Sequence, residues 1–218
     1  GLIGPNGAGK TTFIDALTGF VPCEGRFQIG GEELSGLPPH ARARLGLART
    51  WQSIELFDDL SVRENLAVAS HRGSWLSMMK ETVLRPRGSS PEIERALEVL
   101  DLESAGDALP ADLPQGLRKL IGVARALAAE PRVLCLDEPA AGLDTQESQE
   151  LGRRLRRVVE SGTSILLVDH DMGLVLGICD DVYVLEFGKI IAHGPPETVR
   201  RDPQVITAYL GSAAEEIQ

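Results

Sequence analysis

Three residues into the chain, the sequence reads Gly4-Pro5-Asn6-Gly7-Ala8-Gly9-Lys10-Thr11, which has the spacing G-x-x-x-x-G-K-[ST] of a phosphate-binding loop. Glycines let such a backbone fold tightly around an anion, with successive N–H groups pointing inward. The helix expected at the end of the loop, beginning with Lys10, Thr11 and Thr12, aims the positive end of its dipole at the same phosphates. In such a loop the lysine reaches the β- and γ-phosphates and the hydroxyl ligates Mg²⁺. The stretch therefore predicts a site for a nucleoside triphosphate.

Beyond the loop, short apolar runs alternate with amphipathic helices. Residues 133–136 and 164–168 are predicted to be buried parallel strands, and the amphipathic segment 145–160 is predicted to be the helix that connects them. A terminal β-hairpin is expected from residues 182–185 and 189–192. The pattern predicts an α/β fold of the P-loop NTPase (RecA-like) type, with a mainly parallel sheet.

The middle of the chain is predicted to be helical, from about residue 56 to about residue 128. The capping box at 61–64 opens one helix through Ala69, Ser90-Pro91 opens a second, and apolar residues at helical spacing over 117–127 indicate a third. A loop is expected over 85–89 between the first two. We therefore expect one domain over 1–218, with a RecA-like core at about 1–55 and 129–218 and an inserted helical subdomain at about 56–128. Because only three residues precede the phosphate loop, N-terminal strands are expected to be missing.

Composition limits the partners of the chain. The formal net charge is −10, which disfavours nucleic acid and anionic membrane surfaces as direct partners. Only 4% of the residues are aromatic, so platforms for stacking bases are scarce. Three scattered cysteines fit a reducing, cytosolic location, and no apolar run is long enough to span a membrane. Any membrane association is therefore expected to come through a partner.

Two carboxylates, Asp137 and Glu138, follow the first predicted buried strand. At the carboxyl edge of a parallel sheet they would face the ligand, so Asp137 is a candidate for holding Mg²⁺ and Glu138 for polarising the attacking water. The alternative for this pair is an acidic turn after a strand. His170 follows the next strand at Val168. A contact with the γ-phosphate and a purely structural histidine are equal alternatives for this residue.

The order of these motifs resembles that of the ATP-binding-cassette ATPases, the cytosolic motors of ABC transporters. The similar segments are the Walker A loop at Gly4–Thr11, the Q-loop with Gln52, the Walker B motif at Leu136-Asp137-Glu138-Pro139, the D-loop at Ala141-Gly142-Leu143-Asp144 and the switch histidine His170. The resemblance implies ATP and Mg²⁺ as cofactors, with Glu138 as general base. It implies that Gln52 joins the Mg²⁺ and water network and couples to the membrane subunit. It also implies that two cassettes close head-to-tail around two ATP molecules, with Gly116 and Asp144 among the nucleotide-contacting residues.

Several stretches are similar to one branch of this family, the cassettes of branched-chain amino-acid importers. They are residues 48–52, 137–143, 170–172 and 208–211. Cassettes of lipopolysaccharide exporters are an alternative, which the stretch 37–44 fits about as well. The resemblance implies transmembrane permease subunits as partners and a position on the cytoplasmic face of the cell membrane.

The family signature Leu-Ser-Gly-Gly-Gln aligns with Leu113-Pro114-Gln115-Gly116-Leu117, and this is where the chain departs from the family. Pro114 supplies neither a hydroxyl nor an N–H group, although Gly116 and the start of a helix remain. We therefore expect a homo- or, preferentially, a heterodimer of cassettes in which one composite ATP site is weakened.

The sequence leaves two rival functions. A cassette acting on ribosomes or DNA would use the basic cluster at 153–157, whose alternative interpretation is a solvated helix face. A P-loop kinase would leave Gln52, His170 and the D-loop segment without a role. Transport is favoured.

Overall fold

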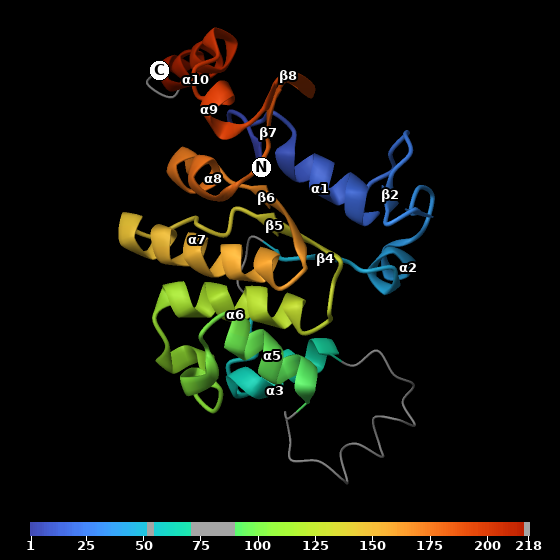
Figure 1. Ribbon diagram of the computed structural model, residues 1–218, viewed down its shortest axis with the longest axis vertical. Helices are drawn as coiled ribbons and strands as arrows, with labels where there is room; N and C mark the ends of the chain where they lie inside the picture. Colours follow the sequence, from blue (N-terminus) through green and yellow to red (C-terminus); the bar gives the residue numbers. More distant parts are fainter. Residues whose placement is uncertain (52–54, 71–89, 216–218) are drawn as a thin grey trace.

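A computed structural model describes residues 1–51, 55–70 and 90–215, and its main sheet is mostly parallel (Figure 1). Six strands lie in the order β4-β5-β6-β1-β7-β8. Neighbours from β4 to β7 are parallel, and β8 is antiparallel to β7. The strands are β1 (Leu2–Ile3), β4 (Leu47–Arg49), β5 (Val133–Asp137), β6 (Ser164–Val168), β7 (Val182–Glu186) and β8 (Lys189–Gly194). The predicted α/β fold is confirmed.

Helices cover both faces of this sheet and extend from one end of it. Figure 1 shows α1 and α2 on one side of the strands, α7 and α8 on the other, and α3, α5 and α6 gathered together below. The helices are α1 (Lys10–Thr18), α2 (Pro39–Arg44), α3 (Val62–Ser70), α5 (Pro91–Val99), α6 (Gln115–Leu127), α7 (Thr145–Glu160), α8 (Met172–Ile178), α9 (Pro196–Val199) and α10 (Pro203–Glu215). A separate hairpin pairs β2 (Gln28–Ile29) with β3 (Glu32–Glu33).

The pleat of the strands divides the core in two. Leu134 and Leu136 of β5 belong to the larger apolar cluster, which the helices α5, α6 and α7 share. Cys135, between them, belongs to the smaller cluster with Ile14 of α1. Because successive side chains on a strand point to opposite faces, Asp137 is placed on the α1 side, as Cys135 is. The pleat thus turns this carboxylate toward the helix that follows the phosphate loop.

The helix signals in the middle of the chain are confirmed at their residues. Ser61 N–H donates to Glu64 Oε2 at 3.0 Å, and Glu64 N–H donates to Ser61 Oγ at 3.3 Å, which closes the predicted capping box of α3. Ser90 caps α5 by accepting from Ile93 N–H. The loop predicted at 85–89 lies outside the described residues.

Parallel strands bring three loops to one edge of the sheet. β1 lies between β6 and β7, and β6 lies next to β5, so the loops after β1, β5 and β6 emerge side by side at the carboxyl edge. In open α/β sheets this edge, outside the ends of the strands, is where ligands bind. No helix in the described ranges is both long and apolar enough to cross a membrane.

Candidate functional site

The phosphate loop is held in place by its glycines and by the turn between β7 and β8. Gly4 has φ +154°, and a Cβ there would lie 2.0 Å from the carbonyl oxygen of Leu185. Gly9 precedes α1 with φ +103°, in the left-handed region that favours glycine. Gly188 N–H donates to Ala8 O at 2.9 Å. A side chain at Gly4 would push the loop away from β7, and one at Gly9 would strain the backbone.

Lys10 folds back onto its own loop. Its Nζ donates to Gly4 O at 2.8 Å and to Pro5 O at 3.1 Å, and the residue is buried. Burial lowers the pKa of this ammonium, and nearby carboxylates, above all that of Glu138, oppose the shift. The amine therefore has two hydrogen bonds that it can exchange for phosphate oxygens, and it faces a negatively charged strand edge.

Asp137 and Thr11 form an oxygen pair across the site. Thr11 Oγ1 donates to Asp137 Oδ1 at 3.5 Å, and Asp137 is only 3% exposed. Burial raises the pKa of Asp137, and the guanidinium of Arg49, 3.6 Å from Oδ2, opposes the shift. A hydroxyl and a carboxylate are the hard oxygen donors that Mg²⁺ takes together with phosphate oxygens and water. These two residues therefore fit that ion.

Glu138 has an unusual backbone conformation, and its carboxylate lies near His170. Its φ is +49°, which few residues other than glycine adopt, and its N–H donates to Val168 O at 2.7 Å. His170 Nδ1 lies 4.0 Å from Glu138 Oε2, and the His170 side chain is 58% exposed. A carboxylate that is 19% exposed and a more exposed imidazole thus lie near each other at the carboxyl edge, where they can accept or donate a proton.

Asp169 is a residue that the sequence interpretation did not place in the site. It is fully buried, and its Oδ2 accepts from Ala140 N–H at 3.0 Å while its Oδ1 accepts from Asp171 N–H at 2.9 Å. It therefore ties the loop after Glu138 to the loop that carries His170. The signal was available, because Asp169 directly follows a buried strand as Asp137 ends one.

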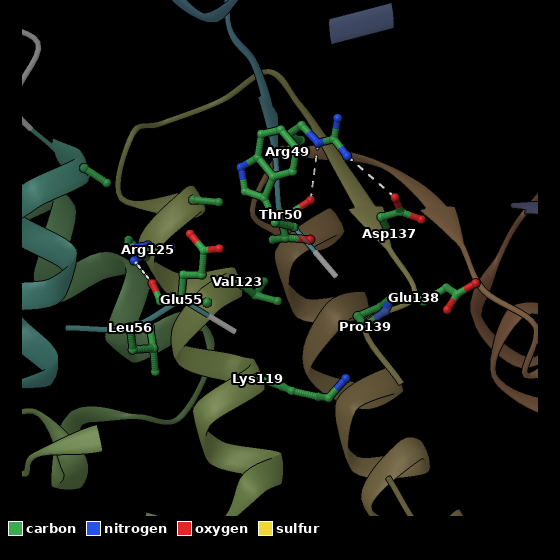
Figure 2. A pocket seen from close by; sticks show the side chains of 14 residues that line it. Arg49, Thr50, Glu55, Leu56, Lys119, Val123, Arg125, Asp137, Glu138 and Pro139 are labelled. Carbon is green, nitrogen blue, oxygen red and sulfur yellow. Dashed lines mark hydrogen bonds and ion pairs between the residues drawn. The ribbon is translucent and has the colours of Figure 1, made fainter. Parts of the chain in front are cut away.

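A cavity of about 190 Å³ opens beside this edge, between β4, β5 and α6 (Figure 2). Asp137 and Glu138 line it from β5, and Lys119 lines it from α6. Lys119 is 8% exposed, and burial lowers the pKa of its ammonium, against the opposing charges of Asp169 and Glu138. The cavity thus joins the strand edge to the helical part of the chain.

The signature-like segment begins a helix, as predicted, but without a side-chain cap. Pro114 precedes α6 and gives it no side-chain hydrogen bond, while Leu117 packs partly buried against the larger core cluster. A Cβ on Gly116 would lie 3.1 Å from Glu147 Oε1, and Asp144 caps the helix that carries Glu147. Gly116 and Asp144 are therefore neighbours of one side chain, that of Glu147. Gln52 lies outside the described residues.

Comparison with known families decides the class of this site. A family model described as ABC transporter matches residues 1–141. The chain belongs to the ABC transporter family. A second model, described as branched-chain amino acid ATP-binding cassette transporter, matches residues 189–215 of the cassette.

Two curated relatives and one solved structure are similar along nearly the whole cassette. The high-affinity branched-chain amino acid transport ATP-binding protein LivG of Escherichia coli (strain K12) is 41% identical over 97% of this chain and 86% of its own length. The lipopolysaccharide export system ATP-binding protein LptB of Acidithiobacillus ferridurans is 35% identical over 97% and 84%. The structure of MJ1267, an ATP-binding cassette of an ABC transporter, superposes with a TM-score of 0.81 at 29% identity, covering 95% of this chain and 86% of that one.

Proposed function

We propose that this cassette hydrolyses ATP to ADP and phosphate and thereby powers an importer of branched-chain amino acids. The observation that carries the proposal is the meeting of Lys10, the Thr11–Asp137 pair and the Glu138–His170 pair at the edge formed by β1, β5 and β6. The likeness to LivG and the match of residues 189–215 support the branched-chain substrate.

The chemistry follows from the positions of these groups. The loop N–H groups, with Lys10 released from Gly4 O and Pro5 O, bind the phosphates. Mg²⁺, held by Thr11 and Asp137, would supply charge neutralisation at the phosphate oxygens. Glu138 accepts a proton from the attacking water while the oxygen of that water bonds to the γ-phosphorus. The bond to the leaving ADP oxygen then breaks, with His170 beside the γ-phosphoryl group.

We expect Gly116 and Asp144 to act across a dimer rather than within the chain. Gly116 lies in the first turn of α6, whose N–H groups have no side-chain cap and favour an anion, whereas the carboxylate of Asp144 caps α7. Because Pro114 offers no hydroxyl there, we propose that a second, different cassette supplies the better signature.

Replacing Pro114 by serine is expected to raise ATP turnover of the assembled transporter. One added hydrogen bond to the γ-phosphate contributes about 0.5–1.5 kcal/mol, or roughly a 2- to 12-fold gain. Leu117→Gln is tested separately, because Leu117 packs against the core and its loss costs stability. Steady-state ATPase assays decide the question, and unchanged turnover in Pro114→Ser would contradict a weakened site.

Partner identity tests the transport proposal. The tagged full-length protein is purified from gently solubilised membranes, and the co-purifying chains are identified by mass spectrometry. We expect permease subunits of the amino-acid importer type and a second cassette, which would place the protein on the cytoplasmic face of the membrane. Ribosomal proteins or DNA in place of permeases would contradict the proposal.

A lipopolysaccharide-type exporter is the second candidate, favoured by the 35% identity to LptB. A cassette acting on nucleic acid is less well supported, because the basic cluster is engaged by the protein itself. Its arginines pair with acidic side chains: Arg153 and Arg154 with Glu150, Arg156 with Asp180, and Arg157 with Asp101. Paired guanidinium groups leave little free charge for phosphates.

A further inference from the structure

One arginine connects the Mg²⁺-binding side of the candidate site to the protein surface. Arg49 is the last residue of β4, and the parallel register pairs it with Cys135, two residues before Asp137 on β5. Its side chain is only 7% exposed. A charged side chain so deeply buried is held by partners, because an uncompensated charge away from water is costly.

The guanidinium of Arg49 forms ion pairs with two carboxylates on different elements. Nη1 lies 2.5 Å from Asp15 Oδ1 on α1, and Nη2 lies 3.6 Å from Asp137 Oδ2 on β5 (Figure 2 shows the second pair). The other oxygen of Asp137, Oδ1, accepts from Thr11. The two oxygens of one carboxylate are therefore divided between Arg49 and the residue that would share Mg²⁺ with it.

The same guanidinium lies over an exposed aromatic pair. Arg49 Cζ lies 4.0 Å from the centre of the Trp51 ring and 5.8 Å from that of Phe20. These two rings meet edge to face at 5.1 Å, and they are 49% and 54% exposed. Trp51 lines both the cavity beside the candidate site and a second cavity of about 310 Å³ next to α1 and α2. Arg49 thus lies between Asp137 and the surface.

We propose that Arg49 is a positioning residue for Asp137, which it orients toward Thr11, and that stacking on Trp51 holds Arg49 in place. The proposal rests on the proposed function of Asp137 in Mg²⁺-dependent ATP hydrolysis. A planar guanidinium can pair with Asp15 and Asp137 at once and still lie over an aromatic ring. Lysine keeps the charge but lacks this shape. The variant Arg49→Lys therefore separates the effect of the charge from the effect of positioning Asp137.

The first test compares Arg49→Gln and Arg49→Lys with the control Arg42→Gln in the full-length cassette. Arg42 is also buried, and its Cζ lies 4.8 Å from the centre of the Phe27 ring, but it donates to backbone carbonyls of residues 16, 17 and 37 instead of pairing with Asp137. We expect both Arg49 variants to lower kcat at least about 10-fold with KM for ATP changed less than about 3-fold, because a misplaced group weakens the transition state more than substrate binding. Arg42→Gln is expected to lower thermal stability and keep kcat.

The second test measures the fluorescence emission of Trp51, which does not depend on ATP turnover. The chain has two tryptophans, so a Trp75→Phe background leaves Trp51 as the only one. Adding Mg²⁺ with a non-hydrolysable ATP analogue is expected to change the Trp51 emission, and Arg49→Gln is expected to abolish that change.

A further variant, Trp51→Leu, keeps Arg49 but removes the ring over which its guanidinium lies. Because Trp51 is 49% exposed, the substitution spares the core, and we expect it to lower kcat as the Arg49 variants do.

The outcomes separate this inference from the function on which it rests. Equal kcat losses in Arg49→Gln and Arg42→Gln, full activity of Arg49→Lys, or an Mg²⁺-induced emission change that persists in Arg49→Gln would overturn the positioning role. A parent cassette without Mg²⁺-dependent hydrolysis would instead overturn the proposed function.

Discussion

Glu138→Gln is expected to lower ATP turnover at least about 100-fold while ATP still binds, because a general base contributes typically 10²–10⁴-fold to such a step. Glutamine has nearly the same shape as glutamate and can occupy the backbone conformation at φ +49° without a change of volume. It cannot accept the proton of the attacking water. The measurements are kcat from steady-state hydrolysis and Kd from equilibrium binding of a fluorescent ATP analogue.

The matched control for this substitution is Glu55→Gln. Glu55 is a carboxylate that lines the same cavity as Glu138 but comes from the other side of it. We expect its kcat to stay close to that of the parent. A Glu138→Gln protein with parental kcat, or one that no longer binds ATP, would contradict the assignment of Glu138 as the base.

Lys10→Met is expected to weaken ATP binding at least about 100-fold, because hydrogen bonds from a charged group contribute about 1.5–3 kcal/mol each and two are lost. Methionine keeps much of the length and apolar volume of lysine, so the loop is expected to fold. The carbonyl oxygens of Gly4 and Pro5 lose the hydrogen bonds that they accept from Lys10 Nζ. Isothermal titration with ATP and Mg²⁺ measures the change.

Lys119→Met is a close control for Lys10→Met. Both lysines are less than a tenth exposed, and burial lowers the pKa of both. Only Lys10 belongs to the phosphate loop, so we expect Lys119→Met to leave the affinity for ATP within about threefold of the parent. Similar losses of affinity in both variants would indicate a general effect of removing a buried cation, and would contradict a specific phosphate contact by Lys10.

Much of this fold could be predicted from the sequence because the interactions that define its helix caps and buried strands involve residues close together in the chain. The capping box at Ser61 and Glu64 and the cap at Ser90 involve residues three apart, so the sequence alone carries them. The buried strands β5 and β6 are apolar on both faces, which predicts a parallel sheet covered by helices. The carboxylates at the end of β5 then follow from the rule that ligands bind at the carboxyl edge.

Other elements escaped prediction because they depend on contacts between distant residues. β4 is three residues long and is defined by its register against β5, which no local pattern carries. The bonds of Asp169 to the loop after Glu138 and the pairing of Arg49 with Asp137 likewise need the order of the strands. Short helices such as α2 and α8 have too few turns to give a clear apolar period.

Substrate uptake driven by this cassette tests the central claim most directly. The full-length protein, its partner cassette and the co-purified permeases are reconstituted into vesicles with ATP and Mg²⁺ on the cassette side, and uptake of radiolabelled leucine is measured. We predict uptake that requires ATP and falls to the background level when Glu138→Gln replaces the parent. Leucine uptake that persists without ATP, or at the parental rate with Glu138→Gln, would contradict the account.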